Sequence, residues 1–367
     1  MAVPAAALGA APDPSPALAK RWTPKRALLT PAAAEHAHGR AVAERCAALG
    51  VEVVELKANR LTGLRGEDPR DTYRRAKTTL GIVVAPPSAM KLQPIPPSAD
   101  FSFHLAHGCP AHCQYCYLAG SLPGPPVTRV YANLDEILAS TEGFEGRGTI
   151  TSRSKTRADE GTTFEASCYT DPLAMEHLTG GLARAVEHFA AREAAGLRFT
   201  TKFDDVGGLL GLAHRGRTRA RFSVNADWVA KRFEGGTAGV GARLRALGRM
   251  ARAGYPVGLT VAPIMPFEGW REGYGALLDA VAAEVAGIDD LDLTAELITH
   301  RFTAGSRAVL QGWYPATVLE MDEEVRTLKR TKFGAEKFVY PKAVMAERKA
   351  FFAVELAARG VRVLYFT

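Results

Sequence analysis

The amino-acid sequence predicts an α/β protein, an incomplete (β/α)6 barrel with an N-terminal α/β extension and a C-terminal basic hairpin and helix. From residue 100 onward, apolar strand patterns alternate with amphipathic helix patterns, which is typical of parallel strands joined by crossover helices. Six such strands would leave a barrel open on one side, wide enough for a bulky substrate. The sequence contains no run of about 18 uninterrupted apolar residues, so we expect no membrane span.

The composition is that of a globular protein, and it indicates a type of partner and a cellular compartment. The chain has 367 residues, 47% apolar and 23% charged, which is ordinary for a folded domain. Its net charge of +7 is compatible with a polyanionic partner. Five cysteines, three of them in one short segment, do not form a disulfide framework and indicate a reducing, cytoplasmic setting.

Changes in pattern divide the chain into four segments. Residues 1–20 are rich in Ala and Pro and lack the charged and apolar regions of a signal peptide, so we expect a disordered tail. The other three segments are the α/β extension over 21–99, the partial barrel over 100–305 and a C-terminal region over 306–367. Within the extension, the pattern predicts a helix over 31–50 and a strand over 51–56.

The barrel elements follow from hydrophobic periodicity. The expected strands are 101–105, 163–167, 197–203, 220–225, 257–264 and 291–298. The expected helices between them are 134–140, 176–194, 229–233, 242–253 and 274–286. Residues 143–161 are rich in Arg, Ser, Thr and Gly and predict a long loop. After residue 342 we expect a helix over 343–359 and a last strand over 361–366.

The strongest chemical signal directly follows the first barrel strand. Residues 107–118 read HGCPAHCQYCYL and contain three cysteines with the spacing Cys-x3-Cys-x2-Cys: Cys109, Cys113 and Cys116. Three thiolates on one loop can hold three corners of a [4Fe–4S] cluster and leave the fourth iron free for another ligand. A structural zinc site that adds His107 or His112 is the alternative, but zinc ribbons use two separated Cys-x2-Cys pairs.

Two kinds of residue near this loop could take part in radical chemistry. Cys168 comes just after the second strand, at the end of the barrel where active sites form. Its thiol could donate a hydrogen atom to a carbon radical, because the S–H bond is weak, or it could be an inert core residue. Tyr115 and Tyr117 flank the last cysteine of the loop and could relay a hydrogen atom or simply pack.

The ends of the next three strands carry candidates for ligand binding. Lys202 ends the third strand and could pair with a carboxylate. Ser223 and Asn225 alternate onto one face of the fourth strand, where they could bind a polar ligand or cap the strand. Ala262 lies near the end of the fifth strand, and its small side chain would permit close approach of a ligand.

Two cationic clusters differ in their expected roles. The cluster over 214–221 precedes the fourth strand, at the end of the barrel opposite the expected site, so a solvated or structural role is favoured. The cluster over 326–342 mixes cations with aromatic residues around Gly334, which predicts a hairpin able to contact a phosphate backbone.

Together these residues resemble the radical S-adenosylmethionine superfamily, and longer blocks are similar to one of its members, the spore photoproduct lyase family. The blocks cover most of the chain from residue 100 to the end: 107–118, 164–179, 201–209, 219–227, 253–273, 296–302 and 365–367. The resemblance implies a [4Fe–4S] cluster on Cys109, Cys113 and Cys116, with S-adenosylmethionine bound to the fourth iron. It also implies a DNA repair lyase, in which a 5′-deoxyadenosyl radical starts the splitting of 5-thyminyl-5,6-dihydrothymine into two thymines.

The resemblance assigns roles residue by residue. It implies that Cys168 is the hydrogen donor and that Tyr115 and Tyr117 help to return the hydrogen. The implied cofactor contacts are Tyr117, Thr170, Lys202, Ser223, Asn225 and Ala262, and the implied DNA contacts are Lys332 and Lys337. Thr170 stands where the family has a serine, and it keeps the hydroxyl.

The implied partners are UV-damaged DNA and a low-potential electron donor of the flavodoxin or ferredoxin type, with no membrane. Two other hypotheses remain open at this point. One is a radical S-adenosylmethionine enzyme acting on a different nucleic-acid lesion or base. The other is a non-catalytic, zinc-stabilised protein that binds nucleic acid.

Overall fold

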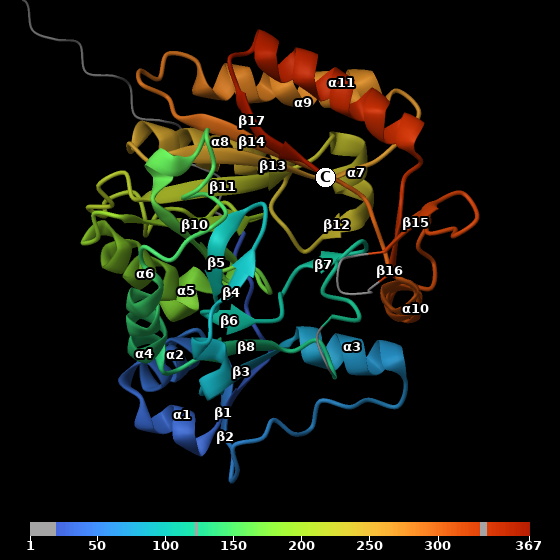
Figure 1. The fold of residues 1–367 in the computed structure, drawn as a ribbon. Coiled ribbons are helices and arrows are strands. Elements are labelled where there is room, and N and C mark those ends of the chain that lie inside the picture. Colours follow the sequence, from blue (N-terminus) through green and yellow to red (C-terminus); the bar gives the residue numbers. More distant parts are fainter. Residues whose placement is uncertain (1–19, 122–123, 331–335) are drawn as a thin grey trace, which may run out of the picture.

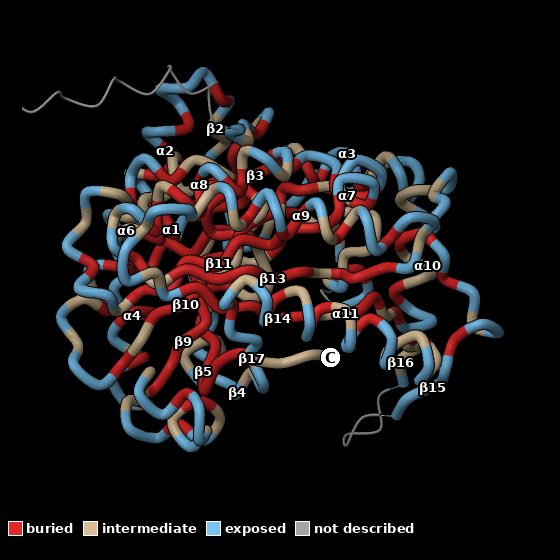
Figure 2. The backbone as a smooth tube through the Cα atoms, turned by 90° about the horizontal axis from the view of Figure 1, so that it is seen from above, coloured by how far each residue is buried: buried red, intermediate tan, exposed pale blue. Residues whose placement is uncertain are grey.

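The computed structural model describes residues 20–121, 124–330 and 336–367 (Figure 1). Within these residues the strands form two large sheets and two small pairs. One sheet has the order β2-β1-β3-β8-β6, and the other has the order β17-β14-β13-β11-β10-β9-β5-β4. Apolar side chains of both sheets belong to one continuous core, shown as the buried centre of Figure 2.

The eight-stranded sheet contains the six predicted barrel strands in the predicted order. Neighbouring strands from β5 to β17 are parallel, and β4 runs antiparallel to β5 at one edge. Every residue of β5, β9 and β11 is buried, as expected for parallel strands covered on both faces. The strands are β4 (Gln93–Ile95), β5 (Ala99–Phe103), β9 (Thr162–Ala166), β10 (Ala195–Thr201), β11 (Thr218–Val224), β13 (Val257–Ile264), β14 (Leu293–Thr299) and β17 (Arg362–Phe366).

Helices follow the strands and pack on this sheet. For example, α8 packs against β11 and β13, while α11 packs against β17 and α9. The helices of this part are α4 (Leu134–Ser140), α5 (Glu176–Thr179), α6 (Gly181–Ala190), α7 (Asp227–Phe233), α8 (Val240–Arg252), α9 (Trp270–Val285), α10 (Ala304–Trp313) and α11 (Lys342–Ala358). Short 3-10 turns are η1 (Pro87–Met90), η2 (Glu142–Phe144), η3 (Ala158–Glu160) and η4 (Leu173–Met175).

Two predicted helices are each divided in the structure. The helix expected over 176–194 is α5 followed by α6, because Gly180 adopts a left-handed backbone with φ of 62° that ends α5. The helix expected over 31–50 is α1 (Pro31–Glu35) followed by α2 (Ala37–Ala48), because His36 is extended. Hydrophobic periodicity continues across both breaks, so it could not reveal them.

The N-terminal sheet includes strands that the sequence pattern did not indicate. Its strands are β1 (Arg26–Leu29), β2 (Glu52–Glu55), β3 (Thr79–Val83), β6 (Ala106–His107) and β8 (Thr128–Tyr131). Four of these are parallel, and β6 is antiparallel to β8. α3 (Pro69–Lys77) precedes β3; Pro69 stands in its first turn and Asp68 caps it by accepting from the Asp71 N–H at 2.7 Å.

The chain crosses between the sheets around the cysteine segment. After β5 it returns to the N-terminal sheet through β6 and β8, so the cysteines are held between two strands of that sheet. In the middle of this segment, β7 (His112–Cys113) pairs with β12 (Glu234–Gly235), which follows α7. The cysteine segment therefore joins both parts of the fold.

The C-terminal cations lie on a two-stranded ribbon beside α10. β15 (Thr327–Arg330) pairs antiparallel with β16 (Glu336–Val339), as expected for a hairpin. The predicted turn, with Lys332 and Gly334, lies outside the described residues. No helix in the described part of the chain is both long enough and apolar enough to cross a membrane.

Candidate active site

Three cysteines face one hollow between α3 and the end of α10. The hollow encloses about 400 Å³, including space open to solvent, and its lining includes Cys109, Cys113, Cys116, Tyr73, Lys77, Trp313 and Tyr314. Gly108 lets the loop begin there, because its φ is +76° and a Cβ would lie 2.3 Å from the Val127 carbonyl oxygen. Only glycine fits that position without moving β8.

The thiols fit an iron–sulfur cluster better than a single metal ion. In the described ranges, no three His, Cys, Asp or Glu side chains converge closely enough to hold one ion. A cluster needs a looser arrangement, because each thiolate binds a different iron. His112, one of the two zinc ligands considered from sequence, has its Nδ1 in a hydrogen bond with the Tyr73 hydroxyl at 2.9 Å. Burial raises the pKa of Cys109 to about 11, so metal binding would displace its proton.

Cys168 lies beyond the carboxyl end of β9, as the strand pattern predicts. Its thiol is half-buried, and burial followed by the negative charge of Glu165 raises its pKa to about 12. The group therefore stays protonated at neutral pH. The hydroxyl of Tyr117 donates to the main-chain carbonyl of Cys168, so the cysteine segment and the end of β9 are in contact. The Tyr117 side chain is otherwise exposed, with a relative accessibility of 60%.

Lys202 is the centre of a second polar group. Its Nζ donates to the Ser223 hydroxyl and lies 3.5 Å from the Ala262 carbonyl oxygen. The same ammonium is 3.8 Å from a Glu234 carboxylate oxygen and 5.7 Å from the centre of the Tyr115 ring. The structure thus brings together candidates from the ends of β10, β11 and β13 with one tyrosine of the cysteine segment.

Sequence reasoning missed two carboxylates in this group. Glu234 is buried, accepts from the Tyr115 hydroxyl and pairs with Arg243 at 2.6 Å. Asp171 accepts from the Lys202 main-chain N–H at 2.6 Å and from the Thr201 hydroxyl at 2.8 Å. Burial raises the pKa of Asp171 to about 6. Neither acid stands at the carboxyl end of a strand predicted from the sequence, and only Asp171 lies within one of the blocks that carry the resemblance, 164–179.

Asn225 and Thr170 differ in the hydrogen bonds that they leave available. Asn225 is fully buried; its amide donates to the Pro263 carbonyl at 2.8 Å, and its oxygen accepts from the Tyr274 hydroxyl at 3.0 Å. That side chain braces the ends of β11 and β13 from inside. The Thr170 hydroxyl is buried and has no hydrogen-bond partner among the described residues. An unpaired buried hydroxyl is costly, which favours a ligand there.

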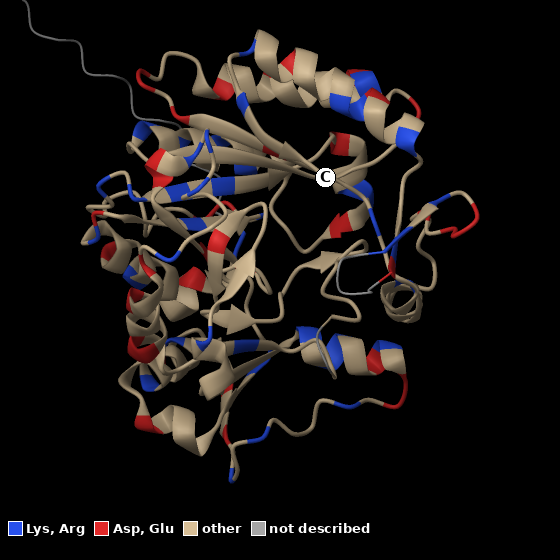
Figure 3. Cartoon of the chain, in the orientation of Figure 1, with Lys and Arg blue, Asp and Glu red and all other residues tan. Residues whose placement is uncertain are grey.

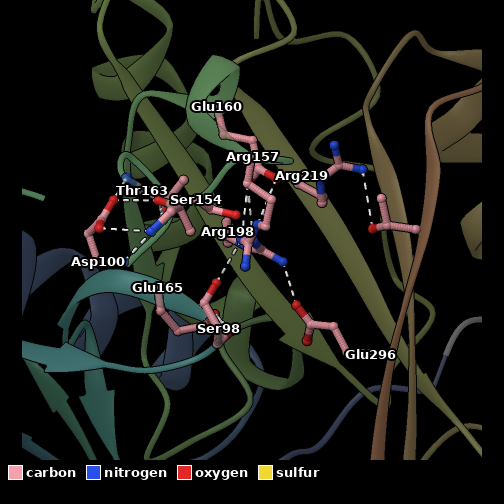
Figure 4. Close-up of polar contacts among 12 residues, drawn as sticks. Ser98, Asp100, Ser154, Arg157, Glu160, Thr163, Glu165, Arg198, Arg219 and Glu296 are labelled. Carbon is pink, nitrogen blue, oxygen red and sulfur yellow. Dashed lines mark hydrogen bonds and ion pairs between the residues drawn. The ribbon is translucent and has the colours of Figure 1, made fainter. Parts of the chain in front are cut away.

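An ionic network joins strands of the eight-stranded sheet (Figure 4). Glu296 of β14 pairs with Arg198 of β10 at 2.5 Å and with Arg221 of β11 at 2.6 Å. Arg221 also pairs with Glu165 of β9. All four side chains are at most 6% exposed. Arg221 belongs to the cluster over 214–221, for which the sequence favours a solvated or structural role. Arg219 of the same cluster is also buried and pairs with Asp292 at 2.5 Å. Both arginines therefore have a structural role.

The C-terminal ribbon carries the remaining cations. Lys329 and Lys337 stand directly opposite each other on β15 and β16. Desolvation, followed by the charges of Arg301 and Lys329, lowers the pKa of Lys337. Arg326, counted with this cluster from sequence, is instead buried; it donates to the His300 carbonyl at 3.1 Å and packs 3.6 Å from the centre of the Tyr340 ring.

Comparisons with known proteins give one consistent result. A family model described as "Spore photoproduct lyase" matches residues 22–367. Relatives of that name from Bacillus subtilis (strain 168) and Geobacillus sp. (strain Y412MC61) are 39% and 40% identical over 322 residues, which is 88% of this chain and 91% of each relative.

Solved structures agree with the sequence relatives. A spore photoproduct lyase mutant with bound AdoMet and dinucleoside spore photoproduct matches with a TM-score of 0.87 and 37% identity, covering 95% of this chain and 100% of that one. A spore photoproduct lyase complexed with dinucleoside spore photoproduct matches with a TM-score of 0.86 and 37% identity, covering 94% and 99%.

Proposed function

Because this chain belongs to the spore photoproduct lyase family, we propose that it splits 5-thyminyl-5,6-dihydrothymine in UV-damaged DNA into two thymines. The observation that carries this proposal is the contact between the three-cysteine segment and Cys168, made through Tyr117. This contact supports a role for Cys168 as hydrogen donor, because the loop that would hold the cofactor touches its main chain. We also infer that the parallel strands and their helices form the incomplete (β/α)6 barrel of radical S-adenosylmethionine enzymes.

Cys109, Cys113 and Cys116 would hold three irons of a [4Fe–4S] cluster, and the methionine end of S-adenosylmethionine would bind the fourth. When bound, this pair supplies a 5′-deoxyadenosyl radical. The hollow lined by the three thiols supports the assignment. The three cysteines are also partly shielded from solvent, which suits thiolate ligands of a cluster.

The side chains around Lys202 would bind and orient S-adenosylmethionine. The Lys202 ammonium can pair with the methionine carboxylate, while Ser223 and the small Ala262 allow close approach. Thr170 supplies a buried hydroxyl that is unpaired among the described residues and could form a hydrogen bond with the cofactor. Tyr117 would close the site from the cysteine segment. Asn225 would contribute by holding the strand ends in place, since its amide is bonded within the protein.

Cys168 would quench the thymine radical formed when the lesion splits. Its S–H bond breaks and a C–H bond forms on the thymine, which leaves a thiyl radical on the cysteine. The raised pKa keeps the hydrogen on sulfur, as this step requires. The O–H bond of Tyr117, whose hydroxyl meets the Cys168 main chain, would then break as the S–H bond of Cys168 forms again. Tyr117 and Tyr115 would help to pass the radical back, so that the cofactor is regenerated.

The C-terminal ribbon would contact the DNA backbone. Lys337 supports this role through the positive charges gathered around it, and Lys332 is assigned to the same ribbon by the resemblance alone. A low-potential electron donor of the flavodoxin or ferredoxin type would reduce the cluster. Thiolate ligands of this kind suit the reducing cytoplasm.

One assay tests the proposal. Anaerobically reconstituted protein is incubated with dithionite, S-adenosylmethionine and a dinucleotide that carries the lesion. We expect thymine monomers together with 5′-deoxyadenosine. Cofactor cleavage without thymine would indicate a different lesion, and a colourless protein that holds zinc and no iron would refute the enzyme mechanism.

A further inference from the structure

Lys77 is a buried cation without an obvious reason to be buried. It ends α3, is 6% exposed and lines the same hollow as the three cysteines. Its Nζ donates to the carbonyl oxygens of Cys109, at 2.5 Å, and of Ala111. The cation thus touches the cysteine segment at its first ligand.

No carboxylate neutralises this cation within the described residues. Asp71, the acid of the same helix, pairs with Arg74 at 2.6 Å and with Arg75 at 2.7 Å on the exposed side. Glu234, near the second cysteine, pairs with Arg243 and Lys202 instead. A buried charge is costly unless an opposite charge lies near it. Two neutral carbonyls satisfy hydrogen bonds but do not supply that charge.

The geometry points to the missing partner: we propose that Lys77 is the counter-ion of the iron–sulfur cluster and favours its reduced form. This inference rests on the proposed function, which places the cluster in the hollow. Three thiolates outweigh the positive charge of the oxidised core, and reduction adds a further negative charge. A fixed cation beside the cluster stabilises the reduced form more than the oxidised form, which raises the reduction potential.

α3 is built to hold this cation in place. The Tyr73 ring lies 5.6 Å from Nζ, and the Tyr73 hydroxyl bonds to His112 Nδ1 at 2.9 Å and to the Tyr314 hydroxyl. The helix therefore contacts the cysteine segment at two points one turn apart. Lys77 is a positioning residue in this scheme, because it acts on the cluster and does not touch the substrate.

Three substitutions separate charge from hydrogen bonding. Lys77→Met removes both, Lys77→Gln keeps a donor without charge, and Lys77→Arg keeps both. Circular dichroism establishes that each variant is folded, and iron content establishes cluster assembly. A redox titration followed by electron paramagnetic resonance then gives the midpoint potential. Arg74→Met, on the exposed side of the same helix, is the matched control.

We expect the ratio of reduced to oxidised cluster at a fixed potential to fall about tenfold in the Met and Gln variants, equivalent to ~59 mV for a one-electron couple. The Arg variant and the Arg74→Met control should keep the wild-type value. Folded Met and Gln variants that both take up no iron, beside an Arg variant that does, would also support the counter-ion.

Equal midpoint potentials in all variants would overturn the inference. A wild-type potential in the Gln variant alongside a lowered one in the Met variant would also overturn it, because hydrogen bonding and not charge would then be the role of Lys77. Both outcomes leave the proposed function intact. A wild-type protein that assembles no iron–sulfur cluster would instead overturn the proposed function, and the inference with it.

Discussion

At the scale of single residues, the proposed function gives the cysteine thiol two different roles in this chain. Burial raises the pKa of Cys109 to about 11 and, with Glu165, the pKa of Cys168 to about 12. A metal can displace the proton of the first thiol, because Cys109 lines the hollow together with two other cysteines. Cys168 lies outside that hollow lining and keeps its hydrogen. The same burial therefore suits one thiol for ligation and the other for hydrogen transfer.

Replacing Cys168 by Ala tests the second purpose. Cofactor cleavage should continue, because no cofactor ligand is lost, but thymine yield should fall about tenfold or more, roughly 1.4 kcal/mol in the barrier. The unquenched radical should appear as adducts with the reductant, detected by liquid chromatography and mass spectrometry. The control is Cys46→Ala, which replaces a fully buried cysteine of α2 and should give normal product. Unchanged thymine yield from the Cys168 variant would refute its role as donor.

The raised pKa of Cys168 predicts an unusual pH profile for alkylation. Only the thiolate reacts with iodoacetamide, and a pKa near 12 leaves far less thiolate at pH 8 than an ordinary cysteine has, a difference on the order of 10³-fold. Because the folded pKa is raised, the rate should still climb about tenfold per pH unit between pH 8.5 and 9.5. The rate is followed by mass spectrometry of the Cys168 peptide.

The urea-unfolded chain is the control for this profile. Its Cys168 has lost the burial and the nearby Glu165, so its rate should level off above its ordinary pKa of about 8.5. The slope of the profile does not depend on how accessible the folded thiol is. A folded-state rate that levels off at the same pH would show that burial does not hold the proton on sulfur.

At the scale of elements, the sequence predicted the strands of the eight-stranded sheet well and those of the N-terminal sheet poorly. The strands over 101–105 and 163–167 were clear, because each is a short apolar run that starts a repeating strand and helix pattern. The helix α3 and the strand β3 follow each other directly, with only Thr78 between them, so no turn residue separated their patterns. β8 pairs with β3 across the sheet, and such non-local pairing leaves no mark in a local pattern.

The candidate site was likewise predicted in part from the sequence. Strand-end logic located Cys168, Lys202 and Ser223, since parallel strands end on one face. The positions of strand ends did not predict that Asn225 forms hydrogen bonds with Pro263 and Tyr274. They also did not predict that Glu234 of β12 lies close to Lys202. Those facts depend on side-chain partners that only the folded chain brings together.

The ionic network of β9, β11 and β14 should matter strongly for stability. Arg221→Met leaves Glu165 and Glu296 buried with one cation fewer, which should cost roughly 3–5 kcal/mol in the free energy of unfolding. Urea unfolding of the metal-free protein measures the change. The control is Arg184→Met, whose pair with Asp135 is exposed and should contribute less than about 1 kcal/mol. Equal losses in the two variants would mean that the network is not a structural element of the barrel.

At the scale of the whole molecule, the cysteine segment lies between two cationic elements. Figure 3 shows Lys and Arg residues on the C-terminal ribbon and on α3, on either side of the region that holds β7 and β12. The ribbon places Lys329 directly opposite Lys337, although like charges at opposed positions are unfavourable. A surface that tolerates this repulsion is suited to a polyanion. The opposed lysines therefore favour the ribbon as the DNA contact.

The salt dependence of DNA binding tests that placement. Each lysine that contacts a phosphate releases counter-ions, so Lys329→Gln combined with Lys337→Gln should reduce the slope of log K against log salt by about 1 per lysine. Fluorescence anisotropy with a labelled duplex at several salt concentrations measures the slope. The matched control replaces Arg215 and Arg217 by Gln, because both precede β11 at the opposite end of the barrel from the candidate site. An equal change of slope in the control variant would contradict DNA binding by the ribbon. It would mean that binding depends on the net charge of the protein and not on where the cations lie.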